Sequence, residues 1–485
     1  MKPGRFFLAG LALSAAALAS ERDTEFLAAA VKGNPVAIET LLAAGADPNA
    51  ATPTGETALH WATQADDGAS VRRLLEASAK ISPNRYGITP LFVAATQGNA
   101  AMITLLLDAG AEASAAAPDG RTPLMMAAQA GRPEAVRALL ARGASVNACE
   151  QAQAQTALMW AAVEGHAEAV KALLAGGADS GARSKNGFTA FLFAVRHGHT
   201  AVVELLLAAG ASANESLLGN GSARAASALA LAVTNQHYEL GARLLAARAD
   251  PNYTWQGRTV LHLVTWVSRP GAGSNDPAPD GTGTMDRVAF VRALVKHGAD
   301  VNCRMATGRG GPRTVLNFKG ATPFLLAART ADVELMRLLV ELGADPKLPN
   351  DNGTTPLMAA AGVGVQSPGE DPGNEAEVLA AVKLAVELGN DVNAVDANGE
   401  TALHGVAYKW AASSVPYLVA QGANIQVWDR KNKSGWTPLR IAAGVHRGMN
   451  LRASPVTAAA LRAAMSAAGV STEVEPETNI SGGTK

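Results

Sequence analysis

Histidine side chains are the first candidates for chemistry in this chain, because imidazole serves both as a general base and as a metal ligand. His60, His262 and His404 each follow a threonine by three residues, in similar segments that lie far apart in the sequence. A position that recurs in this way is typical of architecture rather than of catalysis. His197 and His199 are two residues apart, which places them on different faces of a helix, and no third ligand accompanies them. The histidines therefore predict no metal site.

Other chemical motifs are also missing from the sequence. The glycine-rich segment 308–313 lacks the lysine and serine of a phosphate-binding loop, and there is no G-x-S-x-G motif of a serine hydrolase. The acidic residues of segment 276–286 do not have the spacing of a calcium-binding loop. Two cysteines, Cys149 and Cys303, are too few for a disulfide scaffold or a four-cysteine zinc site. We therefore expect a protein that is not an enzyme and that binds no cofactor or metal.

The composition limits the class of partner. Of the 485 residues, 48% are hydrophobic, which excludes global disorder and is ample for a large core. The 41 lysines and arginines are balanced by 42 aspartates and glutamates, for a net charge of −1. A dedicated nucleic-acid binder usually carries a basic excess. The sequence therefore argues against nucleic acid as the partner.

The histidine segments belong to a repeat that fills most of the chain. Similar segments open at Thr24, Thr57, Thr89, Thr122, Thr156, Thr189, Ser227, Thr259, Thr322, Thr355, Thr401 and Thr437. The first five gaps are 33, 32, 33, 34 and 33 residues. Glycines near the end of each segment keep the same spacing, and Ser78 and Arg248 take their place in two segments. Two independent landmarks with one period predict a repeat protein.

Each repeat predicts two helices and a projecting turn. Thr122 suits the N-cap of a first helix, whose apolar residues recur three and four positions apart. A second helix over 134–141 is expected to turn Leu139 and Leu140 inward. Gly143 suits the left-handed position that follows this helix. The unit is therefore helix, turn, helix and projecting turn.

The repeat resembles a known family. Segment 55–62, Gly-Glu-Thr-Ala-Leu-His-Trp-Ala, is similar to the G-x-T-P-L-H-x-A-A signature of ankyrin repeats, and segments 257–262 and 399–404 look like the same element. Segment 298–302, Gly-Ala-Asp-Val-Asn, resembles the end of the family's repeat. The resemblance covers nearly all of residues 24–470 as about twelve units. It implies an all-α solenoid of helix-turn-helix units with projecting β-turn fingers, in which the repeated histidines hydrogen-bond to the adjacent turn.

Departures from the repeat predict caps, insertions and a tail. We expect an N-terminal cap over 24–50, a C-terminal cap over 437–470 and a flexible tail over 471–485. Four insertions interrupt the repeats: 215–226, 268–284, 304–319 and 364–375. Long loops in compact repeats are often functional, and the alternative is neutral insertion at a tolerant surface site.

The first residues have the pattern of a secretory signal. A basic start precedes an apolar run over 6–18, and small residues suit cleavage before Ser20. The alternative is a buried N-terminal helix. We expect residues 1–19 to be a signal peptide ahead of a solenoid over 20–470. The mature chain would then be exported, periplasmic or secreted, with no membrane anchor, because no later apolar stretch is long enough to span a bilayer.

A binding surface is predicted where first helices and fingers line one face of the solenoid. Large side chains occur at two kinds of position. One lies next to the inward-facing apolar residues of the first helix of each repeat, and the other is the variable residue before each threonine. The candidate groove residues are Trp61, Arg121, Met126, Trp160, Phe188, Phe193 and Arg258. The candidate loop residues are Arg304, Arg309 and Arg313, from an insertion without an acid. Aromatic residues and methionine are typical binding anchors, and the alternative is that they fill gaps between helices.

These observations predict non-catalytic recognition of another protein by the concave face of an exported, monomeric solenoid. Such a protein could act as a scaffold, an inhibitor or an accessory factor. The alternative is an enzyme or small-molecule binder built from the insertions of the second half. It requires ionisable residues to converge around 268–284, 304–319 and 364–375, and the basic and acidic loops could equally pair with each other.

Overall fold

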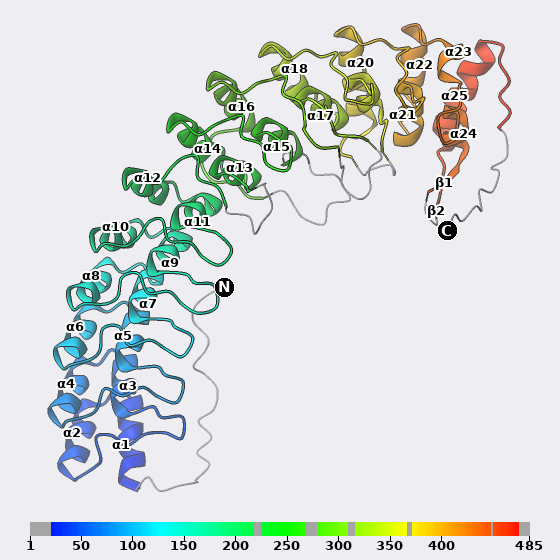
Figure 1. Cartoon of the computed structure of the whole chain (residues 1–485). Coiled ribbons are helices and arrows are strands. Elements are labelled where there is room, and N and C mark those ends of the chain that lie inside the picture. The colour runs from blue at the N-terminus through cyan, green and yellow to red at the C-terminus, as the bar shows by residue number, and fades with distance from the viewer. Residues whose placement is uncertain are drawn as a thin grey trace, which may run out of the picture. The chain divides into compact units, whose positions relative to one another are not determined.

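The computed structural model describes residues 21–217, 225–267, 269, 279–308, 316–365, 371–447 and 450–474. The predicted signal peptide and the tail beyond residue 474 lie outside this part of the chain. The packing divides the chain into two compact units, residues 1–194 with 201–211 and residues 195–200 with 212–485. Within each unit, pairs of helices are stacked one after another (Figure 1).

In the first unit the helices form two rows. The first row consists of α1 (Glu21–Val31), α3 (Ala58–Gln64), α5 (Pro90–Gln97), α7 (Pro123–Gln129) and α9 (Ala157–Glu164). The second row consists of α2 (Pro35–Ala43), α4 (Gly68–Glu76), α6 (Ala100–Asp108), α8 (Pro133–Ala141) and α10 (Ala167–Ala175). Each first-row helix contacts the next one and its own second-row partner. The boundary between the units falls inside α11 (Ala190–His197) and α12 (Thr200–Ala208).

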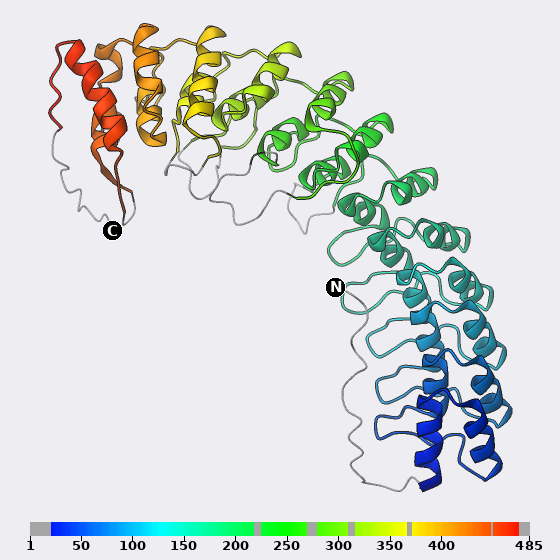
Figure 2. The ribbon, with the colours of Figure 1, turned by 180° about the vertical axis from the view of Figure 1, so that it is seen from behind.

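The second unit repeats this arrangement (Figure 2). Its first row consists of α13 (Ala228–Thr234), α15 (Val260–Val267), α17 (Pro323–Arg329), α19 (Pro356–Ala361), α21 (Ala402–Lys409) and α24 (Pro438–Ala443). Its second row consists of α14 (Tyr238–Ala246), α16 (Arg287–Lys296), α18 (Val333–Glu341), α20 (Glu375–Glu387), α22 (Ser414–Ala420) and α25 (Pro455–Ala467). A single turn, α23 (Ile425–Trp428), and an antiparallel hairpin of β1 (Val445–Arg447) and β2 (Asn450–Arg452) are added near the C-terminal end.

The two rows differ in how they bury their side chains. First-row helix α7 is buried at every position from Pro123 to Ala128, because it has neighbours on several sides. Second-row helix α8 buries Val136 and Leu139 on one face and exposes Glu134. Leu140 is only half-buried, so the prediction that it faces fully inward is corrected. Among the described residues, no helix combines the length and the apolar character that crossing a bilayer requires.

Threonine caps begin the first-row helices, as the sequence predicts. The Oγ1 of Thr89 accepts a hydrogen bond from the Phe92 amide at 3.1 Å, and the same contact recurs in most repeats. It satisfies one of the amides that a helix leaves free at its start. Thr24 is an exception, because α1 begins at Glu21 and Thr24 lies inside it. The predicted start of the N-terminal cap is therefore corrected, and two acidic residues in the first turn favour the earlier start.

The residue that follows the C-cap of the second-row helices has a left-handed backbone, which explains the repeated glycines. Their φ angles lie between 78° and 99° at Gly45, Gly110, Gly143, Gly177, Gly210, Gly298, Gly343, Gly389 and Gly422. Ser78, with φ of 63°, and Arg248, with φ of 67°, adopt the same conformation where the glycine is replaced. The conformation, rather than lack of space, favours glycine here, since no atom lies within 4 Å of a Cβ built on Gly143.

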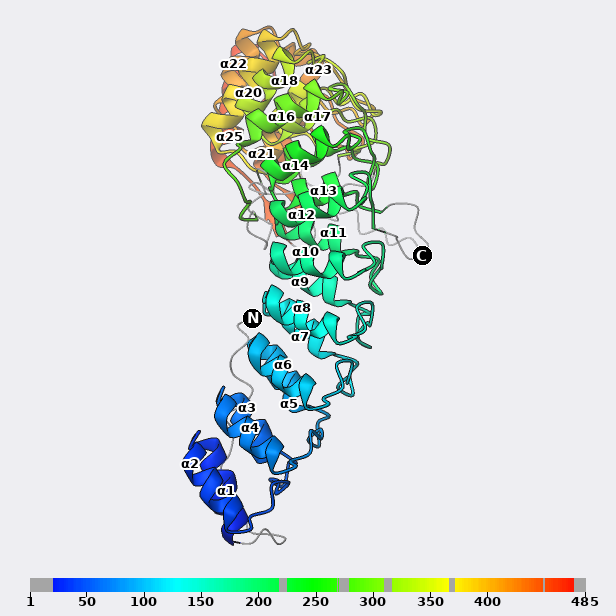
Figure 3. The same cartoon turned by 90° about the vertical axis from the view of Figure 1, so that its left-hand side faces the viewer.

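The turns between repeats project as fingers, and main-chain hydrogen bonds join neighbouring fingers. In the first unit, the Arg85 amide donates to the Thr54 carbonyl at 3.0 Å, and the fingers gather along one edge (Figure 3). In the second unit, the Asp351 amide donates to the Lys319 carbonyl at 2.9 Å. These bonds fix each finger against the next, so each unit presents a pre-ordered edge rather than separate loops.

The insertions lie at two kinds of position in the repeat. Segments 268–284 and 364–375 fall between the two helices of a pair, and residue 375 is already the first residue of α20. Segments 215–226 and 304–319 lengthen fingers. Parts of all four lie outside the described residues, and so do Arg309 and Arg313.

Candidate functional site

The repeated histidines act as structural links between a helix start and the next finger. The Nε2 of His60 lies 3.0 Å from the Ile88 carbonyl, which can only accept, so the ring donates from Nε2. Its Nδ1 accepts from the Thr57 amide at 3.2 Å. His262 and His404 make the same contacts, and burial lowers the pKa of each to about 4. The predicted structural role is confirmed, and both rings are neutral at pH 7.

Both thiols are free. Cys149 is exposed, and Cys303 is half-buried with its Sγ 3.2 Å from the Thr259 Oγ1. Burial raises the pKa of Cys303 to about 11. The neighbouring His262 is too weak a base to deprotonate it, because its Nδ1 already accepts a hydrogen bond and its pKa is about 4. No group of three or more histidine, cysteine or acidic side chains is placed to hold a metal within the described residues.

The groove aromatics of the first unit are only partly accessible. Trp61, Trp160 and Phe188 are half-buried, and the indole Nε1 of both tryptophans is buried with no hydrogen-bond partner among the described residues. Met126 is 7% exposed and Phe193 is 9% exposed. The prediction that these two side chains line an open groove is therefore corrected. They fill space beside the first-row helices, where the Phe193 ring stacks on that of Phe188 with 4.7 Å between centroids.

Arg121 lies on the finger edge of the first unit, and its charge is neutralised there. Its guanidinium is 5.8 Å from the centre of the Phe92 ring. Its Nε is 2.6 Å from the Asp119 carboxylate, two residues earlier in the same finger. Both side chains are well exposed to solvent. The charge is thus paired locally, at a surface where such pairs contribute little to stability.

Arg258 occupies the same position in a finger of the second unit and has different surroundings. Its guanidinium lies 4.9 Å from the centre of the Trp266 ring at the end of α15, and Trp266 is 41% exposed. The guanidinium of Arg329 also lies near Trp266, at 5.9 Å from the centre of its ring, and at 4.7 Å from the ring of the buried Phe318. We call Arg258, Trp266, Phe318 and Arg329 the arginine–aromatic cluster. Burial lowers the pKa of Arg258, and the nearby charge of Arg329 lowers it further.

A buried ion pair supports this cluster. Arg329, at 3% exposure, binds the Asp371 carboxylate through two bonds of 2.6 and 2.8 Å. The Nζ of Lys409, at the end of α21, donates to the Arg329 carbonyl at 3.0 Å. Burial lowers the pKa of Lys409 to about 8, against the opposing effect of the Asp371 charge. Three first-row helix ends and one insertion are thereby held together by charged side chains.

Described parts of the second-half insertions contact one another or the neighbouring repeats, but these contacts do not bring together ionisable residues of all three insertions. Leu316 lies against Gly364, where an added Cβ would come within 2.5 Å of the Leu316 Cβ. Arg269 binds Glu377 at 2.7 Å, which connects segment 268–284 to the start of α20. In the basic loop, Arg304 pairs with Asp351 of the next finger at 3.0 Å. The described part of the basic loop is therefore neutralised by a finger and not by the acidic insertion.

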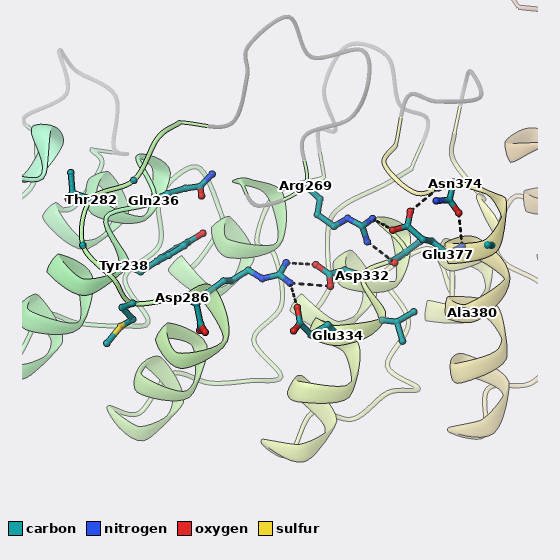
Figure 4. A pocket seen from close by; sticks show the side chains of 17 residues that line it. Gln236, Tyr238, Arg269, Thr282, Asp286, Asp332, Glu334, Asn374, Glu377 and Ala380 are labelled. Atoms are coloured by element: carbon teal, nitrogen blue, oxygen red, sulfur yellow. Dashed lines mark hydrogen bonds and ion pairs between the residues drawn. The ribbon is translucent and has the colours of Figure 1, made fainter.

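A cavity of about 970 Å³ lies beside the starts of the second-row helices in the second unit. Residues 281–283 and 374–377, at the ends of two insertions, form parts of its wall. We call this cavity the acid-lined pocket, because its four carboxylates outnumber its two guanidinium groups. Figure 4 shows that the charged side chains reach toward one another along the wall.

Both guanidinium groups of the acid-lined pocket are held by carboxylates. Arg287 binds Asp332 and Glu334, with 3.0 Å to the latter. Arg269 donates to the Ala331 carbonyl at 2.8 Å as well as binding Glu377. The pocket therefore offers excess negative charge to a ligand, and its positive groups are already occupied.

Sequence reasoning missed Trp266, Arg329, Asp371 and Lys409. Trp266 and Arg329 lie at helix ends, outside the two kinds of position that supply the candidate groove residues. One signal in the sequence marks Trp266 and Arg329. They replace the uncharged polar residues, such as Gln64 and Gln129, that end other first-row helices.

Comparison with known proteins agrees with this geometry. The family model for ankyrin repeats (three copies) matches residues 26–117, 124–217 and 285–366. These matches cover more than half of the chain, so the chain belongs to the ankyrin repeat family.

One similar protein is the palmitoyltransferase AKR1 of the yeast Lachancea kluyveri. It is 31% identical over 154 residues, which is 32% of this chain and 18% of that protein. The chain therefore matches less than a fifth of its relative's length. The similarity supports the ankyrin repeats as the shared part.

Proposed function

We propose that the protein recognises another protein through the face lined by its fingers and first-row helices, and that it catalyses no reaction. Ankyrin repeats imply protein partners in general. The observation that carries the proposal is the finger edge of each unit, where main-chain hydrogen bonds join the fingers and half-exposed aromatic side chains lie beside them. A pre-ordered surface loses little conformational entropy on binding. It suits a scaffold, an inhibitor or an accessory factor.

The test compares two exposed apolar side chains of the second unit. Trp266 is 41% exposed on the first row, and Val419 is 38% exposed on α22 of the second row. The immobilised full chain captures partners from the exported fraction of its own cells, and the dissociation constant is measured for the protein it retains. Trp266→Ala should weaken binding by about 2 kcal/mol or more, roughly thirtyfold. Val419→Ala should leave it unchanged. Equal effects of the two variants, with unaltered melting curves, would refute recognition by this face.

We also propose export as the setting of this recognition. The proposal rests on the sequence of residues 1–19, and α1 begins at Glu21, so cleavage before Ser20 would remove no described helix. N-terminal sequencing of the protein from its own cells should give Ser20 as the first residue. A retained Met1 on the folded protein would contradict export by this signal.

A second candidate function is favoured by the acid-lined pocket. Its volume suits a small molecule, and its excess of carboxylates suits a cationic one. Thermal shift measurements with matched cationic and anionic small molecules should show stabilisation by cations alone, reduced in Glu334→Gln. Stabilisation that is equal for both charges would exclude the pocket as a cation site.

A further inference from the structure

The backbone holds Arg258 in a fixed place on the finger edge. Reciprocal hydrogen bonds of 2.8 and 2.9 Å between Trp255 and Arg258 close a tight turn. The neighbouring finger supports this turn, since the Ala306 amide donates to the Gly257 carbonyl at 2.9 Å and Thr307 donates to Gln256 at 3.1 Å. The side chain then lies over Trp266. The guanidinium is therefore pre-positioned, which lowers the entropic cost of using it for binding.

The charge of Arg258 lacks the counter-ion that Arg121 and Arg304 have on their fingers and that Arg329 has at the end of α17. Arg121 pairs with Asp119, Arg304 with Asp351, and the adjacent Arg329 with Asp371. Within the part of the chain that the structure describes, no carboxylate is in ion-pair contact with Arg258. A half-buried charge next to a like charge is costly unless something neutralises it.

We propose that the arginine–aromatic cluster binds an acidic segment of the partner protein, with a carboxylate on Arg258 and the neighbouring side chain of the segment on Trp266. The inference rests on the proposed recognition by this face and names the chemistry of the partner. Guanidinium binds carboxylate through two parallel hydrogen bonds, and arginine and tryptophan are the residue types that dominate binding energy at interfaces. The exposed ring of Trp266 supplies the apolar contact beside that charge.

An acidic protein segment fits this surface better than nucleic acid does. A nucleic acid needs several cationic contacts to its phosphates. Here Arg329 is already neutralised by Asp371, and Arg304 and Lys319 both bind Asp351, at 3.0 and 3.4 Å. Among the described residues of this surface, one available guanidinium lies beside an aromatic ring, which matches a single carboxylate with an apolar neighbour.

Two matched peptides and the full chain test the proposal. The probe is acetyl-(Glu-Leu)₃-amide, and its control is acetyl-(Gln-Leu)₃-amide. Fluorine NMR of the protein labelled with 5-fluorotryptophan reports binding at Trp266, whose signal is assigned from its loss in Trp266→Phe. The Glu peptide should shift this signal with saturation, and the Gln peptide should bind at least about tenfold more weakly.

Variants at the same position in the two units provide the control. Arg258→Gln should weaken the binding of the Glu peptide by about tenfold or more and leave the binding of the Gln peptide unchanged. Arg121→Gln, at the paired arginine of the first unit, should change neither. Neither variant should melt below the wild type, because neither side chain is in the core and removing the charge of Arg258 relieves its repulsion with Arg329.

Each other outcome overturns the acidic-segment proposal. If Trp266→Ala weakens both peptides equally while Arg258→Gln weakens neither, the face binds apolar segments, and the proposed recognition stands without its acidic chemistry. If no variant changes the binding of either peptide, or if the signal does not move at millimolar peptide, both proposals fail for this surface. Tighter binding of a short single-stranded oligonucleotide than of the Glu peptide would assign the cluster to nucleic acid.

Discussion

The two units contain the same repeat, but the second unit has a buried arginine–carboxylate pair, whereas the pairs described in the first unit are exposed. In the first unit Arg121 pairs with Asp119, two residues away and well exposed. In the second unit Arg329 pairs with Asp371, 42 residues away, and both side chains are buried. In a regular array, side chains of one repeat reach only those of the same repeat and its neighbours. An insertion can bring a carboxylate across the helix ends and bury the pair.

This difference assigns different roles to the units. The first unit keeps the large apolar side chains of Phe193 and Met126 within its packing. In the second unit, charged residues hold the insertions, and the exposed Trp266 lies near two guanidinium groups. The regular unit thus behaves as a framework, and the unit with insertions carries the more distinctive surface.

The largest effect should come from breaking the buried pair of the second unit. Asp371→Asn leaves the guanidinium of Arg329 buried without a counter-ion and should cost about 3–5 kcal/mol of unfolding free energy. Asp119→Asn, in the exposed pair of the first unit, should cost less than about 1 kcal/mol. Urea unfolding followed by hydrogen exchange of each unit measures both. Similar costs for the two variants would show that burial does not distinguish these pairs.

Truncating aromatic side chains should reverse the order of the two units, because here the buried side chain lies in the first unit. Phe193→Ala removes a buried ring and should cost about 3–5 kcal/mol, comparable to Leu139→Ala at about 2–5 kcal/mol. Trp266→Ala should cost clearly less, because much of its ring is already in water. Melting curves of the three variants decide this. If Trp266→Ala destabilises as strongly as Phe193→Ala, the exposed ring is part of the core after all.

The histidines should make the second unit more sensitive to acid. His404 has a pKa of about 4 when folded and about 6.5 when unfolded, so the unfolded chain takes up the proton first as pH falls. The contribution of His404 to the free energy of unfolding is complete above about pH 6.5. It is lost as the pH falls toward 4, at about 1.4 kcal/mol per pH unit. The second unit contains two such histidines, His262 and His404, and the first unit contains His60.

A methionine variant isolates this contribution. In the neighbouring repeat, Met358 takes the position of the histidine, and its Sδ accepts from the Thr355 amide at 3.4 Å. His404→Met should therefore fold and should show a shallower loss of stability between pH 6.5 and 4, measured by urea unfolding. An unchanged slope would mean that His404 titrates normally in the folded protein.

The periodic features could be predicted from the sequence, and the contacts of the insertions could not. Threonine caps, left-handed glycines and histidine links recur at fixed spacing, so each occurrence supports the others. The pair of Arg329 and Asp371 occurs once, and its partners are 42 residues apart with no periodic signal. The burial of Phe193 also escaped prediction, because a helix position beside the core stripe can be covered by its own finger, as Phe188 covers it.

The smallest effect concerns the two thiols, which should differ in reactivity without changing stability. Cys149 is exposed on a finger of the first unit, whereas Cys303 lies against Thr259 in the second unit with a pKa raised by burial to about 11. Two pKa units above an ordinary thiol reduce the thiolate fraction near neutral pH about a hundredfold. Labelling with Ellman's reagent at pH 8 should therefore give one fast thiol, absent in Cys149→Ser, and one much slower thiol.

In urea both should react at the same rate, with a total of two per chain. Two equally fast thiols in the native protein would show that the finger of Cys303 does not pack against Thr259 as described. Fewer than two in urea without reductant would show a disulfide, which the two free cysteines of the structure contradict.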